Sequence, residues 1–191
     1  VMAPDIYTKF LLDVPCTRNL CFTNRCRKIL NAYCMDWAHD QAGGGESMVL
    51  DCGDAGGDQP VVLMVGTPLI AKKCEKVKHH VLKNETFGVT ALHMAGEEAG
   101  HGMTLERKDS DAGPFAFAAT EFSALFHVAY ATTVHKSQSS SYNFPYAIYE
   151  FGRMSKNLKY TALTRTTKSE YVHLNRLPSE IYDYYKQLLG L

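Results

Sequence analysis

The strongest periodic signal in the chain is an apolar face that repeats at the spacing of an α-helix. Its members are Cys26, Ile29, Leu30, Tyr33, Cys34 and Trp37. Apolar residues at these intervals predict an amphipathic helix. A short apolar stretch, residues 20–22, comes before it, and between the two lie Thr23 and Asn24, both favourable N-cap residues. A strand, a polar turn and a helix form an α/β unit, and such a turn is a natural binding position for an anion.

The remaining segments extend this α/β pattern and interrupt it with a β-rich region. Strands are predicted at residues 61–65, 86–94, 103–107, 146–151 and 171–174, and helices at residues 156–166 and 179–189. The short strands within residues 61–107 indicate a small β module inserted into an α/β domain. Residues 40–59 are rich in glycine and acids and predict a mobile surface loop. The apolar run of residues 122–130 predicts a buried strand.

The charge balance argues against a protein that holds a polyanion by its overall field. Lys+Arg and Asp+Glu both number 20, so the formal net charge is +0, whereas proteins that bind nucleic acid nonspecifically are usually basic. Basic side chains gather in residues 18–28 and 72–83, which is typical of solvated faces. No stretch is apolar for the length of a membrane-spanning helix, and no secretory signal opens the chain. We expect a fragment of an intracellular protein, from the nucleus, the cytoplasm or a viral replication site.

Six cysteines raise the question of a metal site. They are Cys16, Cys21, Cys26, Cys34, Cys52 and Cys74. The first four fall close together, but their spacing lacks the paired C-x2-C knuckles of zinc sites. Cys26 and Cys34 also belong to the apolar helix face, where free cysteine behaves as a small hydrophobe. Reduced, buried thiols without a bound metal are the favoured interpretation, and a zinc-stabilised interaction domain remains the less favoured alternative.

A dense polar cluster follows the apolar run. Thr133, His135, Lys136 and Gln138 place a hydroxyl, an imidazole, an ammonium and a carboxamide within six residues. Each of these side chains taken alone would more often serve packing or a surface contact. Together in so short a stretch, they suit contacts to phosphate and sugar. The cluster therefore predicts an anion-binding site at the end of a strand.

A second polar cluster comes about twenty residues later, at residues 160–165. Thr161, Thr164 and Arg165 share one face of a helix or turn, and the Arg165 guanidinium there is able to bind a phosphate bidentately. The chain contains no Gly-Lys dipeptide and hence no phosphate-binding loop of the G-x-x-x-x-G-K-[ST] form. It does not hold a nucleoside triphosphate by that route unaided.

The two clusters resemble motifs of superfamily 1 helicases. Thr-Val-His-Lys-Ser-Gln at residues 133–138 resembles motif V, and Tyr-Thr-Ala-Leu-Thr-Arg at residues 160–165 resembles motif VI. The strand and helix that open the second motor domain of the RecD-like branch are similar to the segment that contains Phe22, Thr23, Asn24, Arg27 and Asn31. A segment of the barrel inserted in that domain is similar to residues 65–68 with Asn84 and Glu85. Since order and spacing agree across nearly the whole chain, the sequence resembles a UvrD/RecD-like C-terminal domain of a superfamily 1 DNA helicase.

This resemblance implies a RecA-like parallel sheet flanked by helices, with a small inserted β-barrel-like module. The C-terminal motor lobe would comprise residues 1–58 and 118–191, and the inserted module residues 59–117. The implied activity is ATP hydrolysis coupled to translocation on single-stranded DNA and duplex unwinding. ATP and Mg²⁺ would be held mainly by the N-terminal RecA-like lobe of the same polypeptide, so this chain alone is expected to be inactive. No membrane partner is implied.

The resemblance also implies roles for particular residues. Arg165 would be the catalytic arginine finger that reaches the γ-phosphate, and Gln138 and Ser139 would line the nucleotide cleft beside it. The implied DNA-binding residues are Thr23, Asn24, Thr67, Thr133, His135 and Lys136. Ser139 stands where the family has glycine, a residue that permits positive φ or a close backbone approach. Together with the neutral charge, that departure keeps open a non-catalytic nucleic-acid-binding module with a motor-lobe fold.

Overall fold

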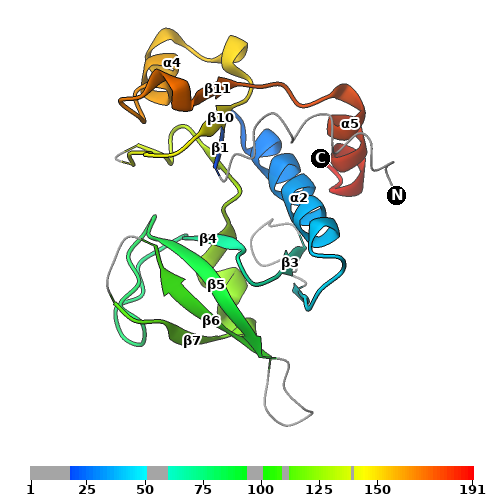
Figure 1. The fold of residues 1–191 in the computed structure, drawn as a ribbon, viewed down its shortest axis with the longest axis vertical. Coiled ribbons are helices and arrows are strands. Elements are labelled where there is room, and N and C mark those ends of the chain that lie inside the picture. The colour runs from blue at the N-terminus through cyan, green and yellow to red at the C-terminus, as the bar shows by residue number, and fades with distance from the viewer. Residues whose placement is uncertain (1–17, 51–59, 94–100, 109–111, 139) are drawn as a thin grey trace. The chain divides into compact units, whose positions relative to one another are not determined.

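A computed structural model describes residues 18–50, 60–93, 101–108, 112–138 and 140–191 of the chain (Figure 1). The chain forms two compact units. The first, which we call the parallel-sheet unit, comprises residues 1–33 and 130–191, and the second, which we call the antiparallel unit, comprises residues 34–129. One of the two unit boundaries falls inside helix α2, Asn24–Gln41.

The parallel-sheet unit is built on four parallel strands in the order β11-β10-β1-β9. These are β1 (Asn19–Cys21), β9 (Ala131–Thr133), β10 (Tyr146–Ile148) and β11 (Val172–Leu174), with α2, α4 (Lys156–Leu163), α5 (Ser179–Leu188), and the 3-10 turns η2 (Phe151–Arg153) and η3 (Ser169–Tyr171). β1 is central, because Asn19 is level with Ala147 of β10 on one side and Ala131 of β9 on the other. The predicted strand–turn–helix unit is confirmed.

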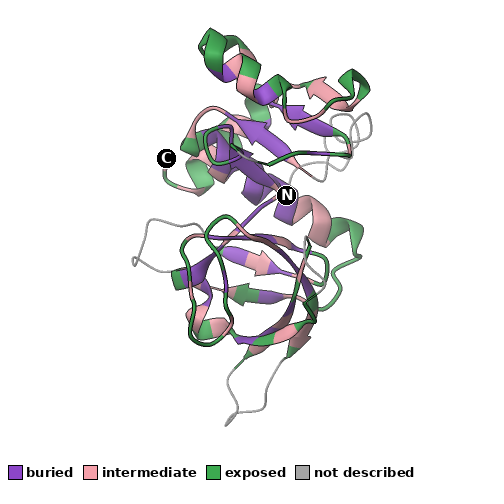
Figure 2. Ribbon diagram, turned by 90° about the vertical axis from the view of Figure 1, so that its left-hand side faces the viewer, coloured by how far each residue is buried: buried purple, intermediate pink, exposed green. Residues whose placement is uncertain are grey.

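The parallel sheet is covered on both faces. Successive residues of a strand point to opposite sides, so Leu20 packs in one cluster with Leu158 of α4, while Cys21 packs in another with Cys26 and Leu30 of α2. Every residue of β1, β9 and β10 is buried (Figure 2). Burial on both faces explains why these strands show no alternation of apolar and polar residues.

Asn31 of α2 is a buried polar residue that fastens strand β9 to the helix. Its side chain is 1% exposed. The Nδ2 group donates to the Ala131 carbonyl at 3.3 Å, and Oδ1 accepts from the Ala131 N–H at 2.8 Å. One side chain thus satisfies both backbone groups of a residue in a strand at the end of the sheet order.

The antiparallel unit contains a five-stranded sheet in the order β7-β6-β5-β4-β8. Its strands are β4 (Pro68–Ala71), β5 (Thr86–His93), β6 (Gly102–Arg107), β7 (Phe115–Ala118) and β8 (Phe126–Val128). β5 and β6 confirm the strands predicted at residues 86–94 and 103–107. The core is aromatic: the Phe126 ring lies 5.2 Å from that of Phe87 and 5.1 Å from that of Phe117, both in edge-on geometry.

The apolar run of residues 122–130 is not one buried strand, and that prediction is wrong. The turn η1 (Ala119–Glu121) leads into α3 (Phe122–Leu125), β8 then pairs with β4, and β9 begins only at Ala131. Phe122 and Phe126 are buried and their rings pack together within the antiparallel unit. The run is apolar because α3 and β8 both bury side chains in the antiparallel unit.

The glycine-rich segment contains a strand that the sequence did not indicate. β2 (Met48–Leu50) pairs antiparallel with β3 (Val61–Leu63), and Met48 lies opposite Leu63, both buried. The loop prediction for residues 40–59 is therefore wrong at these positions. Residues 51–59 lie outside the described part of the chain. A three-residue strand offers too little periodicity to be distinguished from a loop by pattern alone.

Candidate functional site

Three neighbouring strands of the parallel-sheet unit end at the same edge of the sheet. Since β10, β1 and β9 are adjacent and parallel, their carboxyl ends lie side by side. Glu150 follows β10, Thr23 and Asn24 follow β1, and residues 134–138 follow β9. Open parallel sheets bind ligands at such carboxyl ends. The structure thus brings together five of the predicted DNA-binding residues, which are Thr23, Asn24, Thr133, His135 and Lys136.

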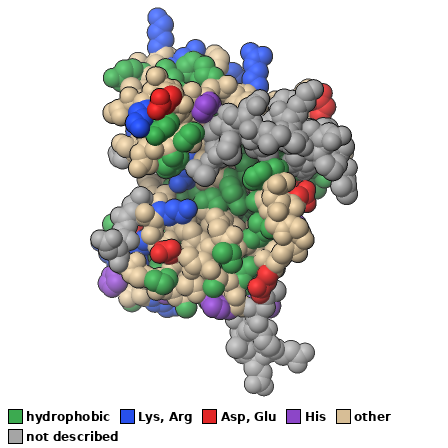
Figure 3. Space-filling model, in the orientation of Figure 1, with side chains coloured by type: hydrophobic (Ala, Val, Ile, Leu, Met, Phe, Trp, Pro, Cys, Tyr) green, Lys and Arg blue, Asp and Glu red, His purple; other side chains and the backbone are tan. Residues whose placement is uncertain are grey.

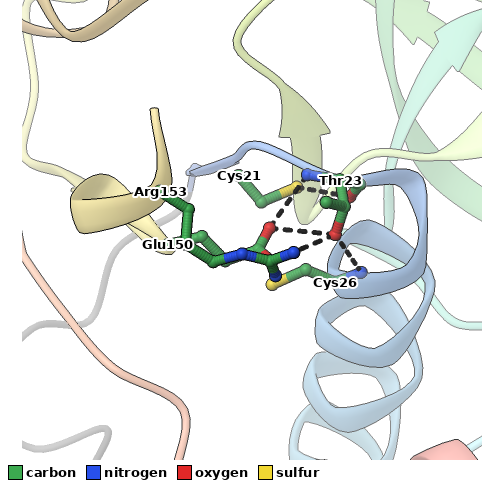
Figure 4. Close-up of polar contacts among 5 residues, drawn as sticks. All are labelled: Cys21, Thr23, Cys26, Glu150 and Arg153. Atoms are coloured by element: carbon green, nitrogen blue, oxygen red, sulfur yellow. Dashed lines mark hydrogen bonds and ion pairs between the residues drawn. The ribbon is translucent and has the colours of Figure 1, made fainter. Parts of the chain in front are cut away.

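Thr23 is the N-cap of helix α2 and the most heavily bonded residue of this edge (Figure 4). Its Oγ1 accepts from the Cys26 N–H at 3.1 Å and lies 3.0 and 3.1 Å from the two carboxylate oxygens of Glu150. Its own N–H donates to Glu150 Oε2 at 2.9 Å. Asn24, the first residue of the helix, is exposed. The N-cap expected of this Thr-Asn pair is confirmed, with Thr23 in the capping position.

Thr23→Ala is expected to lower the free energy of unfolding by about 1 kcal/mol, the usual cost of losing an N-cap hydroxyl. The Cys26 N–H and the Glu150 carboxylate lose a partner in this variant. Urea denaturation followed by circular dichroism measures the change. Thr23→Ser is the matched control, since it keeps the hydroxyl and should stay near the wild-type value. Equal losses in both variants would show that the methyl group, not the cap, stabilises this turn.

The turn after β9 is held by its own side chains and presents others to solvent. Thr133 is 5% exposed, and its Oγ1 accepts weakly from the Lys136 N–H at 3.4 Å. Ser137 is buried and its hydroxyl donates to the Val134 carbonyl at 2.8 Å. The side chains of His135, Lys136 and Gln138 are exposed. Thr133 therefore shapes the turn, while His135 and Lys136 are placed to meet a ligand.

Arg165 lies against this same turn. Its Nη1 donates to the carbonyls of Ser137 and Ser140, both at 3.2 Å, and its Nε donates to the Thr161 carbonyl at 2.8 Å. Among the described residues it pairs with no carboxylate. Neutral carbonyls orient the guanidinium without cancelling its charge, so it remains able to attract an anion. Ser139, the other residue predicted with Gln138 for the nucleotide cleft, lies outside the described residues.

Two tyrosines contact the C-terminal end of helix α4 and Arg165, which lies in the turn just after it. The Tyr146 hydroxyl of β10 donates to the Ala162 carbonyl at 2.7 Å, and burial raises the pKa of Tyr146 to about 12. The Tyr142 N–H donates to the Arg165 carbonyl at 2.6 Å. Helix α4 begins with Ser155 as N-cap, whose Oγ accepts from the Leu158 N–H. The position of Arg165 is thus fixed from the sheet and from the turn after β9.

Thr67, the sixth predicted DNA-binding residue, belongs to the antiparallel unit. It is 1% exposed, and its Oγ1 accepts from the Met64 N–H at 2.9 Å. Gly66 beside it has φ +92°, a conformation that favours glycine. The structure therefore gives Thr67 a part in the turn between β3 and β4. A role in binding DNA remains a prediction from the resemblance alone.

The basic segment of residues 72–83 is partly neutralised within the antiparallel unit. The Lys78 ammonium pairs with Glu121 at 2.7 Å, and Lys72 donates to the Ser123 carbonyl. Glu75 accepts from the N–H groups of Lys78, His79 and Val77, which lowers its pKa to about 2. On the face shown in Figure 3, basic side chains are interspersed with acidic and neutral ones. This agrees with the formal net charge of +0.

The cysteines described by the structure are free thiols. Cys21, Cys26 and Cys34 are buried and Cys74 is exposed. A hydrogen bond with Cys21 and burial together raise the pKa of Cys26 above its ordinary range, so this thiol stays protonated. Within the described ranges no three metal-ligating side chains gather into a site. Cys16 and Cys52 lie outside those ranges.

Sequence reasoning missed Glu150, Ser137 and Ser140 as parts of this edge. Ser140 acts through its backbone carbonyl, which carries no signal in the sequence. Ser137 lies within the polar cluster of the sequence, but the sequence did not indicate that its side chain is buried. Glu150 fell inside the strand predicted at residues 146–151. Because β10 ends at Ile148, Glu150 instead follows the strand at the edge where open parallel sheets bind ligands.

No model of a protein family matches the sequence, and no curated protein matches it. Among solved structures the chain is similar to Pif1 helicases. A structure of two coordinating Pif1 helicases unwinding forked DNA is 16% identical, with a TM-score of 0.57 over 91% of this chain and 44% of that one. Pif1 from Bacteroides with ADP-AlF3 and single-stranded DNA is 15% identical, with a TM-score of 0.53 over 91% and 45%. Pif1 from Candida albicans is 12% identical, with a TM-score of 0.54 over 91% and 49%.

At such identities the shared property is the fold. The chain spans a little under half the length of these Pif1 structures. It has the mixed α/β fold of a portion of a Pif1 helicase, with a four-stranded parallel sheet and an antiparallel β module, and the predicted fold class is confirmed. No helix in the described part of the chain has the length and apolar character needed to cross a membrane.

Proposed function

We propose that this chain is the second motor lobe of a superfamily 1 DNA helicase. The observation that carries the proposal is the position of Arg165, whose guanidinium is oriented by the carbonyls of Ser137 and Ser140 and pairs with no carboxylate among the described residues. A cation held in this way suits the γ-phosphate of ATP bound to another lobe. The fold shared with part of Pif1 supports the proposal.

This sequence lacks a phosphate-binding loop of the G-x-x-x-x-G-K-[ST] form. ATP and Mg²⁺ would therefore be held mainly by a first lobe that contains such a loop. When bound, they supply the phosphoryl group and its charge neutralisation. Arg165 would stabilise charge on that group, and Gln138, with Ser139, would line the same cleft. Arg165 donates a hydrogen bond to the turn after β9, which carries His135 and Lys136. In this scheme, closure of the cleft between the two lobes around ATP would therefore also move His135 and Lys136.

The nucleic-acid edge would consist of Thr23, Asn24, His135 and Lys136 and would bind single-stranded DNA through its phosphates, with the buried Thr133 shaping the turn that carries His135 and Lys136. Phosphate contacts carry no base information, so binding should be tolerant of sequence. We also assign the inserted module to the antiparallel unit. The module would then comprise residues 34–129 and not the predicted residues 59–117. β8 falls in the range predicted for the motor lobe, but it pairs with β4 of the module.

Lys136→Ala is expected to weaken binding of single-stranded DNA by roughly fivefold at low salt, uniformly across sequences. It should reduce the slope of log K against log salt by about 0.7, the value for one lost phosphate contact on a single strand. Fluorescence anisotropy with labelled oligonucleotides measures both quantities. Lys186→Ala, which removes an equal charge from α5, is the control and should leave the slope unchanged. A similar change in both variants would argue against a phosphate contact at Lys136.

The alternative is a nucleic-acid-binding module that keeps the fold of a motor lobe without contributing to ATP hydrolysis. Ser139 at the glycine position and the neutral net charge favour it. The two proposals make the same prediction for Lys136 and opposite predictions for Arg165. The Arg165 variant therefore distinguishes between them.

A further inference from the structure

Glu150 has a backbone conformation that its residue type disfavours. It lies just after β10 with φ 58° and ψ 22°, in the left-handed region. Residues other than glycine, asparagine and aspartate rarely occupy this region, and they persist there where the surrounding contacts determine the geometry. The contacts of the Glu150 side chain are therefore expected to hold this backbone conformation.

The Glu150 carboxylate occupies the turn between β1 and α2 (Figure 4). The side chain is only 12% exposed. Oε2 accepts from the Thr23 N–H at 2.9 Å, and the Thr23 hydroxyl lies within 3.1 Å of both carboxylate oxygens. Oε1 also accepts from Arg153, whose side chain is 64% exposed, at 2.5 Å. An anion of the protein thus sits where a strand meets a helix N-terminus, which is the position that an external anion would take.

The contacts with Glu150 leave Thr23 with no hydrogen-bonding capacity for another anion. Its N–H and its hydroxyl proton both point to Glu150, its Oγ1 accepts from the Cys26 N–H, and its carbonyl accepts from the Arg27 N–H. A phosphate group that binds Thr23 must therefore replace the carboxylate. Two anions cannot share these donors, because they repel each other at such short range.

We propose that Glu150 is an internal anion that competes with a nucleic-acid phosphate for the turn between β1 and α2. This inference rests on the proposed function, since it takes that edge as the nucleic-acid site. Displacement is feasible because Arg153 already binds Oε1 and remains as a solvent-exposed partner for the carboxylate once Thr23 is released. Release also removes the contacts that hold the disfavoured backbone at Glu150. This competition lowers the affinity of Thr23 for a phosphate. A lobe that repeatedly binds and releases a strand requires such a limited affinity.

The test compares binding of a fluorescein-labelled oligothymidylate by the 191-residue chain and by two variants that each remove one negative charge. Glu150→Gln keeps an acceptor for Thr23 but removes the competing charge, so affinity should rise about three- to tenfold, the effect of removing one repulsive charge near a phosphate. Glu170→Gln removes the same charge from η3, where Glu170 is exposed. It should change affinity far less. Thermal unfolding by circular dichroism establishes that each variant is folded.

An affinity of Glu150→Gln that equals that of Glu170→Gln, or falls below wild type, overturns the inference, because Glu150 then only positions Thr23. Glu150→Gly serves if the glutamine variant does not fold, since glycine tolerates the observed φ. It too must bind more tightly than wild type. If the wild-type chain itself does not bind the oligonucleotide, the proposed function and the inference both fail. That outcome is recognised from the wild type and is distinct from failure of the variants alone.

Discussion

Arg165→Ala is expected to reduce DNA-stimulated ATP hydrolysis about 10³- to 10⁵-fold in a protein that joins this chain to its first lobe, the range found for arginine fingers. The guanidinium is already oriented by three backbone carbonyls and is not neutralised by a carboxylate among the described residues. The positive charge of Arg165 should therefore act mainly to stabilise the transferring phosphoryl group. Phosphate release at saturating DNA measures the rate.

Arg165→Lys is the matched variant. Lysine keeps the charge but loses the planar fork that donates to Thr161 and Ser137 while meeting a phosphate. We expect its activity to stay well below wild type while the affinity for single-stranded DNA is kept. A wild-type rate in Arg165→Ala would remove the finger assignment and favour the non-catalytic module. A parallel loss of DNA affinity and thermal stability would instead show that Arg165 only holds the turn after β9.

Asn31→Ala is expected to lower the free energy of unfolding by about 2–4 kcal/mol, because it leaves the buried N–H and carbonyl of Ala131 without partners. Urea denaturation followed by circular dichroism and by intrinsic fluorescence measures the loss. Asn157→Ala, at an exposed position in the first turn of α4, is the control and should change stability by less than about 0.5 kcal/mol.

A loss below about 1 kcal/mol for Asn31→Ala would mean that water or a rearranged side chain replaces the amide. Strand β9 would then not depend on Asn31. A loss in the expected range explains why an asparagine stands on the buried side of α2, where the apolar pattern alone would place a hydrophobic residue. Its place in the helicase-like motif is then a structural one.

The sequence predicted helix α2 closely because Cys26, Ile29, Leu30 and Tyr33 repeat at the period of an α-helix, and that pattern is local. It predicted β5 and β6 from their β-rich composition. It did not predict β2, or the division of residues 122–130 between α3 and β8. Each of these elements depends on tertiary packing. β2 forms by pairing with β3, and the Phe126 ring of β8 packs against Phe87 of β5 and Phe117 of β7.

The candidate site divides in the same way. The residue types of Thr133–Gln138 and Tyr160–Arg165 were sufficient to indicate an anion-binding edge and its helicase-like pattern. The hydrogen bonds of Arg165 to Ser137 and Ser140 could not be predicted from the sequence. They join segments about twenty-five residues apart through backbone carbonyls, which have no sequence signature.

By itself, then, the sequence determined the α/β class, the amphipathic helix α2 and the chemical character of the edge, since these follow from local periodicity and residue type. Only the tertiary structure decided that Thr23 and Glu150 are bonded across 127 positions of the chain, and that Thr67 and Thr133 turn their hydroxyls inward. The physical reason is that the pairing of β1 with β9 and β10 sets which strand ends become neighbours.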